Sequence, residues 1–119
     1  MKTKNNRISK ITDSDFSAFL LYLKEERNYS DKTVLSYGED VASFLLHLEE
    51  EKLSKETIDK SDIRNYLFLL RKEKLENTSI RRKIEALRHF YNYLQKKDIV
   101  TKDPFLTLSL PKKSKKLPE

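Results

Sequence analysis

Basic side chains within residues 77–94, NTSIRRKIEALRHFYNYL, are the groups of this sequence most able to do chemistry. At about 100° per residue, a helix over this stretch places Arg81, Arg82 and Arg88 on one polar arc, with an apolar stripe opposite. The guanidinium group is planar and donates paired hydrogen bonds to a phosphate or to the acceptor edge of guanine. The arc is therefore either an ordinary charged surface or a surface that binds an anion, and both interpretations remain open from this helix alone.

Polar groups at two predicted helix starts would add to such a surface. Thr78 and Ser79 open the stretch just described, where unbonded N–H groups and the positive end of the helix dipole favour phosphate. Lys32, Thr33 and Ser36 stand near the start of an earlier predicted helix, with Lys32 and Ser36 one turn apart on the same face. These side chains suit contacts with base edges and phosphates, although a capped helix start explains them better when they are taken alone.

Candidates for catalysis or metal binding are few. The sequence has no Cys, which excludes disulfide frameworks and thiolate metal sites, and His47 and His89 belong to no metal or nucleophile motif. Gly38 is the only glycine, so there is no glycine-rich phosphate loop, and the acids of residues 49–51 suit a solvated helix end. We therefore predict no catalytic residue, no metal site and no cofactor in this chain.

Positive charge is sorted along the chain rather than mixed, within a formal net charge of +6. Residues 1–12 carry four bases and no acid, residues 39–65 carry eight acids against four bases, and residues 71–97 carry nine bases against three acids. Such blocks indicate an anionic partner, although solvated surfaces also carry them. No run is long and apolar enough to span a membrane, and the amino terminus has no signal-peptide core, so we predict a soluble, cytoplasmic protein.

Apolar residues at helical spacing define the elements that must position these groups. They predict four helices, over about residues 14–27, 30–51, from 61 onward, and 77–97. The expected N-caps are Asp13 or Ser14, then Ser30, Ser61, and Asn77 or Thr78. Asp103 and Pro104 end the helical structure and allow a short turn. We predict an all-α fold, a four-helix bundle of two helical hairpins with a short C-terminal turn and a basic tail.

Three stretches of the sequence together follow a family pattern. They are SDKTVLSY with the EDVASF that comes next, TSIRRKIEALRHFY, and DPFLTLSLPK. In this order they resemble the second helix, the fourth helix and the exit of the N-terminal core-binding domain of tyrosine recombinases, the phage-integrase and Xer-like group. The resemblance covers about residues 13–118, and it implies a SAM-like helical domain that forms one half of a clamp around DNA, with its second and fourth helices facing the major groove.

The resemblance also implies which residues contact DNA. Carried over by position, the candidates on the second helix are Lys32 and Ser36, supported by Thr33 and Tyr37. The candidates on the fourth helix are Thr78, Ser79, Arg81, Arg82 and Arg88, and those of the basic tail are Lys112, Lys113, Lys115 and Lys116. The family's catalytic residues belong to a second domain, and nothing in this sequence matches them.

The sequence departs from the family pattern in two respects. Asn28, Lys52, Lys74 and Asp98 stand where the family often has a glycine at helix ends, which puts the geometry of the loops in question more than the function. Glu85 stands where serine is common, so this part of the fourth helix is expected either to sit away from phosphates or to pair with a neighbouring arginine.

The same resemblance predicts how the chain is organised. Residues 1–12 would be a flexible basic arm, 13–108 the core-binding domain, and 109–119 a basic linker towards a catalytic domain that this sequence lacks. The predicted function is that of the DNA-binding domain of a site-specific tyrosine recombinase or integrase, which clamps duplex DNA and does not cleave it. Its partners would be double-stranded DNA, the catalytic domain of the same full-length chain and other protomers on DNA, with the fragment alone a monomer.

Two alternatives remain from the residues. The first is a helical protein–protein interaction module whose basic face meets an acidic partner. The second is a DNA-binding regulator of helix-turn-helix type, which ranks lowest because the helix pair over 61–97 lacks the compact turn of that motif.

Overall fold

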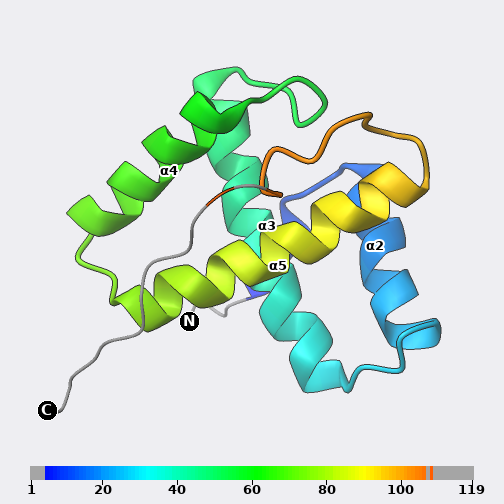
Figure 1. Ribbon diagram of the computed structural model, residues 1–119. Helices are drawn as coiled ribbons and strands as arrows, with labels where there is room; N and C mark the ends of the chain where they lie inside the picture. The colour runs from blue at the N-terminus through cyan, green and yellow to red at the C-terminus, as the bar shows by residue number, and fades with distance from the viewer. Residues whose placement is uncertain (1–4, 107, 109–119) are drawn as a thin grey trace, which may run out of the picture. The chain divides into compact units, whose positions relative to one another are not determined.

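The computed structural model of the chain describes residues 5–106 and 108 (Figure 1). Within them lie five α-helices and no β-strand: α1 (Asn5–Ser9), α2 (Ser14–Glu25), α3 (Asp31–Glu51), α4 (Lys60–Lys72) and α5 (Asn77–Lys96). The predicted all-α fold is confirmed. The chain divides into two compact units, unit 1 up to residue 55 and unit 2 from residue 56, and each contains one of the two predicted helix pairs.

The short helix α1 is an element that the sequence analysis does not predict. It lies within the segment expected to be a basic arm, and it contacts α3. A Cβ atom at Gly38 of α3 would lie 3.0 Å from Ile8 Cδ1 and 3.4 Å from Leu20 Cδ2, so the glycine allows α1 and α2 to approach α3 closely. Arg7 of α1 also pairs with Glu39 of α3 at 3.4 Å. The helix has only 5 residues, too few to show an apolar repeat, which is why the periodicity misses it.

An ion-pair cluster fastens the start of α2. Asp13 is the N-cap, as predicted, and its side chain accepts a hydrogen bond from the N–H of Asp15 at 2.8 Å. Lys55 Nζ lies 2.8 Å from Asp13 Oδ2 and 3.1 Å from Asp15 Oδ2, and the Lys55 side chain is only 10% exposed. The cluster therefore ties the chain that follows α3 to the first turn of α2.

The caps of the next two helices differ in how well the sequence predicts them. Ser30 caps α3 as expected, since the Thr33 N–H donates to Ser30 Oγ at 3.2 Å. The cap of α4 is Asp59 and not Ser61, so that prediction is wrong. Asp59 Oδ1 accepts the Asp62 N–H at 3.2 Å, while the Asp59 N–H donates to Asp62 Oδ2 at 3.1 Å, which makes a reciprocal capping box. Ser61 fails as the N-cap because it already lies inside the helix, where its backbone is not extended.

The helix α5 begins without a side-chain cap. Its N-cap residue is Glu76, whose side chain makes no capping hydrogen bond, so the predicted caps Asn77 and Thr78 are wrong. Both of those residues lie inside the helix. The predicted apolar stripe is buried, at 0–1% exposure for Ile80, Ile84, Leu87, Tyr91 and Leu94. Burial of this face therefore sets the rotation of α5 without help from a cap.

Left-handed residues end α3, α4 and α5 in one shared motif. Lys52, Lys74 and Asp98 have φ of 59°, 65° and 61°. In each case the next N–H reaches back five residues to a leucine carbonyl, in the pairs Leu53–Leu48 (2.9 Å), Leu75–Leu70 (3.3 Å) and Ile99–Leu94 (2.9 Å). This is the Schellman arrangement, which usually places glycine at the left-handed position. Together with Asn28, at φ 56°, these are the four positions where the sequence departs from the glycines of the resembled family.

The chain beyond α5 forms the predicted turn around Pro104. The Phe105 N–H donates to Asp103 Oδ1 at 2.9 Å, and the Leu106 N–H donates to the Asp103 carbonyl at 3.1 Å. Phe105 is fully buried, with its ring centroid 5.2 Å from that of Tyr91 on α5. The turn is thus fixed to α5 by an aromatic contact.

Candidate nucleic-acid interface

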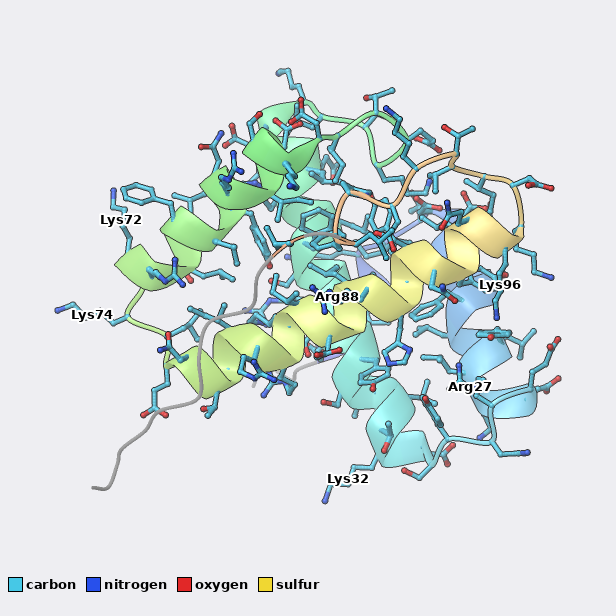
Figure 2. The ribbon with its side chains drawn as sticks, in the orientation of Figure 1. Arg27, Lys32, Lys72, Lys74, Arg88 and Lys96 are labelled. Atoms are coloured by element: carbon cyan, nitrogen blue, oxygen red, sulfur yellow. The ribbon has the colours of Figure 1, made fainter. Side chains whose placement is uncertain are left out.

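The first turns of α3 carry the predicted contact residues in two environments. Lys32 and Ser36 are exposed, whereas Thr33 and Tyr37 are half-buried. Thr33 Oγ1 accepts a hydrogen bond from Ser30 Oγ at 3.1 Å, which makes it part of the cap network. Figure 2 shows Lys32 extending outward from the start of α3. Lys32 and Ser36 are therefore the two residues of this group placed to meet a ligand directly.

A basic and aromatic cluster joins the loop before α3 to that helix, and its loop residues Arg27 and Tyr29 are not among the predicted contacts. The ring of Tyr37 meets that of Tyr29 edge-on, with centroids 5.8 Å apart. The Arg27 guanidinium lies 5.2 Å from the centre of the Tyr29 ring and donates to the Tyr29 hydroxyl at 3.0 Å. Arg27 is exposed (Figure 2), so it adds a positive group close in sequence to Lys32. The interleaved residues Arg27-Asn28-Tyr29 were the available signal.

On α5 the predicted residues follow the exposed arc of the first two turns. Thr78 and Arg82 are exposed, and Ser79 and Arg81 are half-buried. No side chain caps the first turn of α5. A helix start with uncapped N–H groups carries partial positive charge, which adds to the arginines in favouring an anion.

Arg88 is placed differently from the other predicted arginines. Its side chain donates to the Leu108 carbonyl at 2.6 Å, and its Nε atom is buried without a hydrogen-bond partner. Burial raises the pKa of the nearby Asp103 carboxyl, against the lowering effects of the Phe105 N–H and of the Arg88 charge. Arg88 is thus engaged by the chain that follows α5, which a helical projection of α5 alone does not contain.

Further basic side chains lie on α4, which the sequence analysis did not nominate. Phe68 is 62% exposed, and the Lys72 ammonium lies 5.6 Å from the centre of its ring. Lys72 and Lys74 extend from the C-terminal end of α4 and the residues just after it (Figure 2). The remaining predicted contacts, Lys112, Lys113, Lys115 and Lys116, lie outside the residues that the structure describes.

Residues 5–106 and 108 contain no group of His, Cys, Asp and Glu side chains that could hold a metal ion. Over the same residues, no helix has the length and apolar character needed to cross a membrane.

Comparisons with known proteins extend these observations. The family described as phage integrase, N-terminal SAM-like domain, matches residues 16–98. A protein named tyrosine recombinase XerC from Staphylococcus epidermidis strain ATCC 35984 is 44% identical over 101 residues, which are 85% of this chain and 34% of that protein. A protein of the same name from Staphylococcus aureus strain JH9 is 45% identical over 102 residues, 86% of this chain and 34% of that protein. The chain spans about a third of the length of the curated relatives it matches. No solved structure matches it significantly.

Proposed function

The chain belongs to the family of phage integrase N-terminal SAM-like domains, and from this premise we propose that it is the DNA-binding domain of a site-specific tyrosine recombinase. The observation that carries the proposal is the family match over residues 16–98, which includes most of α2 and all of α3, α4 and α5. In the full-length enzyme, a second domain would break and rejoin DNA through a phosphotyrosine intermediate. This chain would hold the duplex and would not cleave it.

The proposed contacts are made by α3 and α5, each facing the major groove. On α3 the exposed Lys32 and Ser36 would reach phosphates or base edges, with Arg27 added from the preceding loop. On α5 the exposed Thr78 and Arg82 would do the same, next to an uncapped helix start. Lysine and arginine supply affinity by releasing counterions from DNA, so binding is expected to weaken steeply with salt. A plot of the logarithm of the binding constant against the logarithm of the salt concentration should fall with a slope of about 0.9 for each phosphate contacted.

Titration with duplex DNA, followed residue by residue by NMR at two salt concentrations, tests the proposal. Chemical-shift changes are expected to cluster on residues 32–37 of α3 and on the first two turns of α5. Affinity should fall as salt rises. Changes that avoid both regions would mean that these helices are not the DNA-binding surface.

A pair of variants on α3 provides the matched control. Lys32→Ala and Lys52→Ala each remove one positive charge, from the start and from the end of the same helix. Lys32→Ala is expected to weaken DNA binding and to reduce the salt slope by about 1, as for loss of one phosphate contact. Lys52→Ala should leave the slope unchanged. Equal effects of the two variants would mean that DNA binding depends on the net charge of the chain and not on the position of Lys32.

An acidic protein partner is the second candidate, and one observation favours it. Phe68 is 62% exposed on α4 beside Lys72, and an exposed ring gains little from phosphates but gains from an apolar contact. Shift changes that cluster on α4 with an acidic peptide, in the absence of any response to DNA, would support this candidate over the first.

A further inference from the structure

The chain after α5 runs back along that helix. We call residues 98–106 and 108 the exit segment. Three contacts join the exit segment to α5, and their order is reversed between the two: Gln95 Nε2 to the Thr101 carbonyl at 3.1 Å, the Tyr91 ring to the Phe105 ring at 5.2 Å, and Arg88 to the Leu108 carbonyl at 2.6 Å. Figure 1 shows this segment leaving the end of α5 and turning back over it.

The three contacts lie about one turn apart on α5, so they act as a series of fastenings. The first is exposed, the second is a contact between fully buried rings, and the third is made by a half-buried arginine. The contact between Arg88 and Leu108 is the last of the three along the exit segment. The Arg88 side chain therefore fixes Leu108, at the end of the described part of the exit segment, to α5.

The surroundings of Arg88 are built to hold it inward. One of its terminal nitrogens donates to the Leu108 carbonyl, and the Arg88 charge lies near enough to the Asp103 carboxyl to lower its pKa. These contacts offset the cost of the Nε atom, which is buried without a hydrogen-bond partner. A hydrogen bond from a charged donor to a carbonyl is stronger than one between neutral groups. Turning the guanidinium outward to a phosphate would break this bond and leave the Leu108 carbonyl without it.

We propose that Arg88 is a positioning residue that anchors the exit segment at mid-length of α5, and that it does not contact DNA itself. The anchor stands on the contacts just described, while its consequence for DNA rests on the proposed function. From the last residue of α5, Lys96, back to Arg88 is eight residues, or about 12 Å along the helix axis. The anchor therefore holds Leu108 against the middle of α5 and not near the C-terminal end of that helix.

Replacement of Arg88 by Met tests the anchor, because Met keeps an apolar stem and loses the charge and the donors. The readout is amide hydrogen exchange at Leu106 and Leu108, whose N–H groups bond to the carbonyls of Asp103 and Phe105. Arg88→Met is expected to speed exchange at both amides by about tenfold, since one charge-assisted bond is lost. Amides in the middle of α4 should not change, which shows that the domain remains folded.

Arg82→Met is the matched control, on the same helix and at an exposed position. It is expected to weaken DNA binding several-fold and to leave exchange in the exit segment unchanged. Arg88→Met should do the reverse, with a loss of DNA affinity clearly smaller than that of Arg82→Met. Arg88→Lys, which retains a donor for the Leu108 carbonyl, should restore part of the protection.

The outcomes separate the anchor from the proposed function. Unchanged exchange in Arg88→Met, or a loss of DNA affinity equal to that of Arg82→Met, overturns the positioning role. Faster exchange in Arg88→Met, together with no DNA binding by the unaltered chain, supports the anchor and overturns the DNA-binding proposal instead. If Arg88→Met fails to fold, amide exchange is measured in Arg88→Lys instead. The positioning role is overturned if Arg88→Lys keeps full protection of the exit segment while its DNA affinity falls as much as that of Arg82→Met.

Discussion

Polar side chains in the described parts of the two units make two kinds of contact that can be compared. In unit 1, three basic side chains pair with carboxylates: Arg7 with Glu39, Lys24 with Asp31, and Lys55 with both Asp13 and Asp15. In unit 2, the charged Arg88 and the neutral amide of Gln95 donate to backbone carbonyls of the exit segment. The difference teaches that a positive residue in this fold is informative only once its surroundings are known. An ion pair joins two side chains, whereas a bond from a side chain to a carbonyl fixes the path of the backbone.

The largest loss of stability is expected on substitution of Lys55 in unit 1, whose side chain is only 10% exposed. Lys55→Met leaves the carboxylates of Asp13 and Asp15 close together without their cation, at 26% and 29% side-chain exposure. Removing one partner of a largely buried pair is costly, so the free energy of unfolding should fall by about 2 kcal/mol. Urea denaturation followed by circular dichroism measures the change.

Lys24→Met is the control for that prediction. Lys24 pairs with Asp31, but the two side chains are 54% and 83% exposed, and exposed pairs contribute little. No measurable loss is expected. Equal losses at Lys24 and Lys55 would show that burial does not separate the ion pairs of unit 1.

An intermediate effect is expected at the helix ends, where the two units are built alike. Lys52 in unit 1 and Lys74 in unit 2 both adopt left-handed conformations that cost a residue with a side chain about 1 kcal/mol. Lys52→Gly and Lys74→Gly should each raise the free energy of unfolding by up to about 1 kcal/mol, measured by urea denaturation.

Two further glycine variants sharpen that test. Asn28→Gly should gain less, because asparagine already tolerates the left-handed region. Glu50→Gly, inside the last turns of α3, should lose stability, because glycine disfavours helical residues. If Lys52→Gly raised the free energy of unfolding and Lys74→Gly did not, the helix ends of the two units would differ in their conformational cost.

The smallest change in stability is expected from two acids of unit 2, Asp59 and Asp103. Their ionisation changes the stability in opposite directions as the pH rises. Hydrogen bonds led by the one from the Ser61 side chain hold the pKa of Asp59 below its ordinary 3.8, so its contribution to stability is present above that pH and is lost as the pH falls. Burial raises the pKa of Asp103 above 3.8, so its ionisation lowers stability as the pH rises through the range just above that value.

Asparagine variants test these opposite signs in acid titrations of stability. Asp59→Asn should lower stability at neutral pH and flatten the loss in acid. Asp103→Asn keeps an oxygen for the Phe105 N–H, so it should leave stability at neutral pH unchanged or slightly higher. Changes of the same sign for both variants would contradict the assignment.

Most of the fold could be predicted because its helices carry apolar stripes at a clear period. The buried faces of α2, α3, α4 and α5 coincide with those stripes, as with Phe16, Phe19 and Leu23 on α2. The caps were harder, since Asp59 and Ser61 are both good N-cap residues two positions apart. Only the backbone conformation, extended at Asp59, decides between them. The Schellman ends were readable in principle from the apolar residues at their first and last positions, such as Leu70 and Leu75.

The candidate site was less predictable because a helical projection contains only one helix. It places Arg82 and Arg88 on the same polar arc of α5, and both were nominated for the same contact. The structure adds the exit segment, which returns over α5 and engages Arg88 through the Leu108 carbonyl. Arg27 was missed for a different reason, since the sequence predicted it as the last residue of the first long helix, whereas it lies in the connection after α2, beside Tyr29.

The packing of α1 has a practical consequence for anyone who handles this protein. Proteolytic trimming up to Ser9 would remove Ile8, the nearest of the side chains packed on Gly38, and would leave only Leu20 of α2 close to that position. It would also strip Arg7 from Glu39, one of whose carboxylate oxygens is buried without a hydrogen bond. Shortened versions made to ease crystallisation or expression should therefore begin no later than residue 5, and a fused affinity tag should leave α1 able to seat on α3.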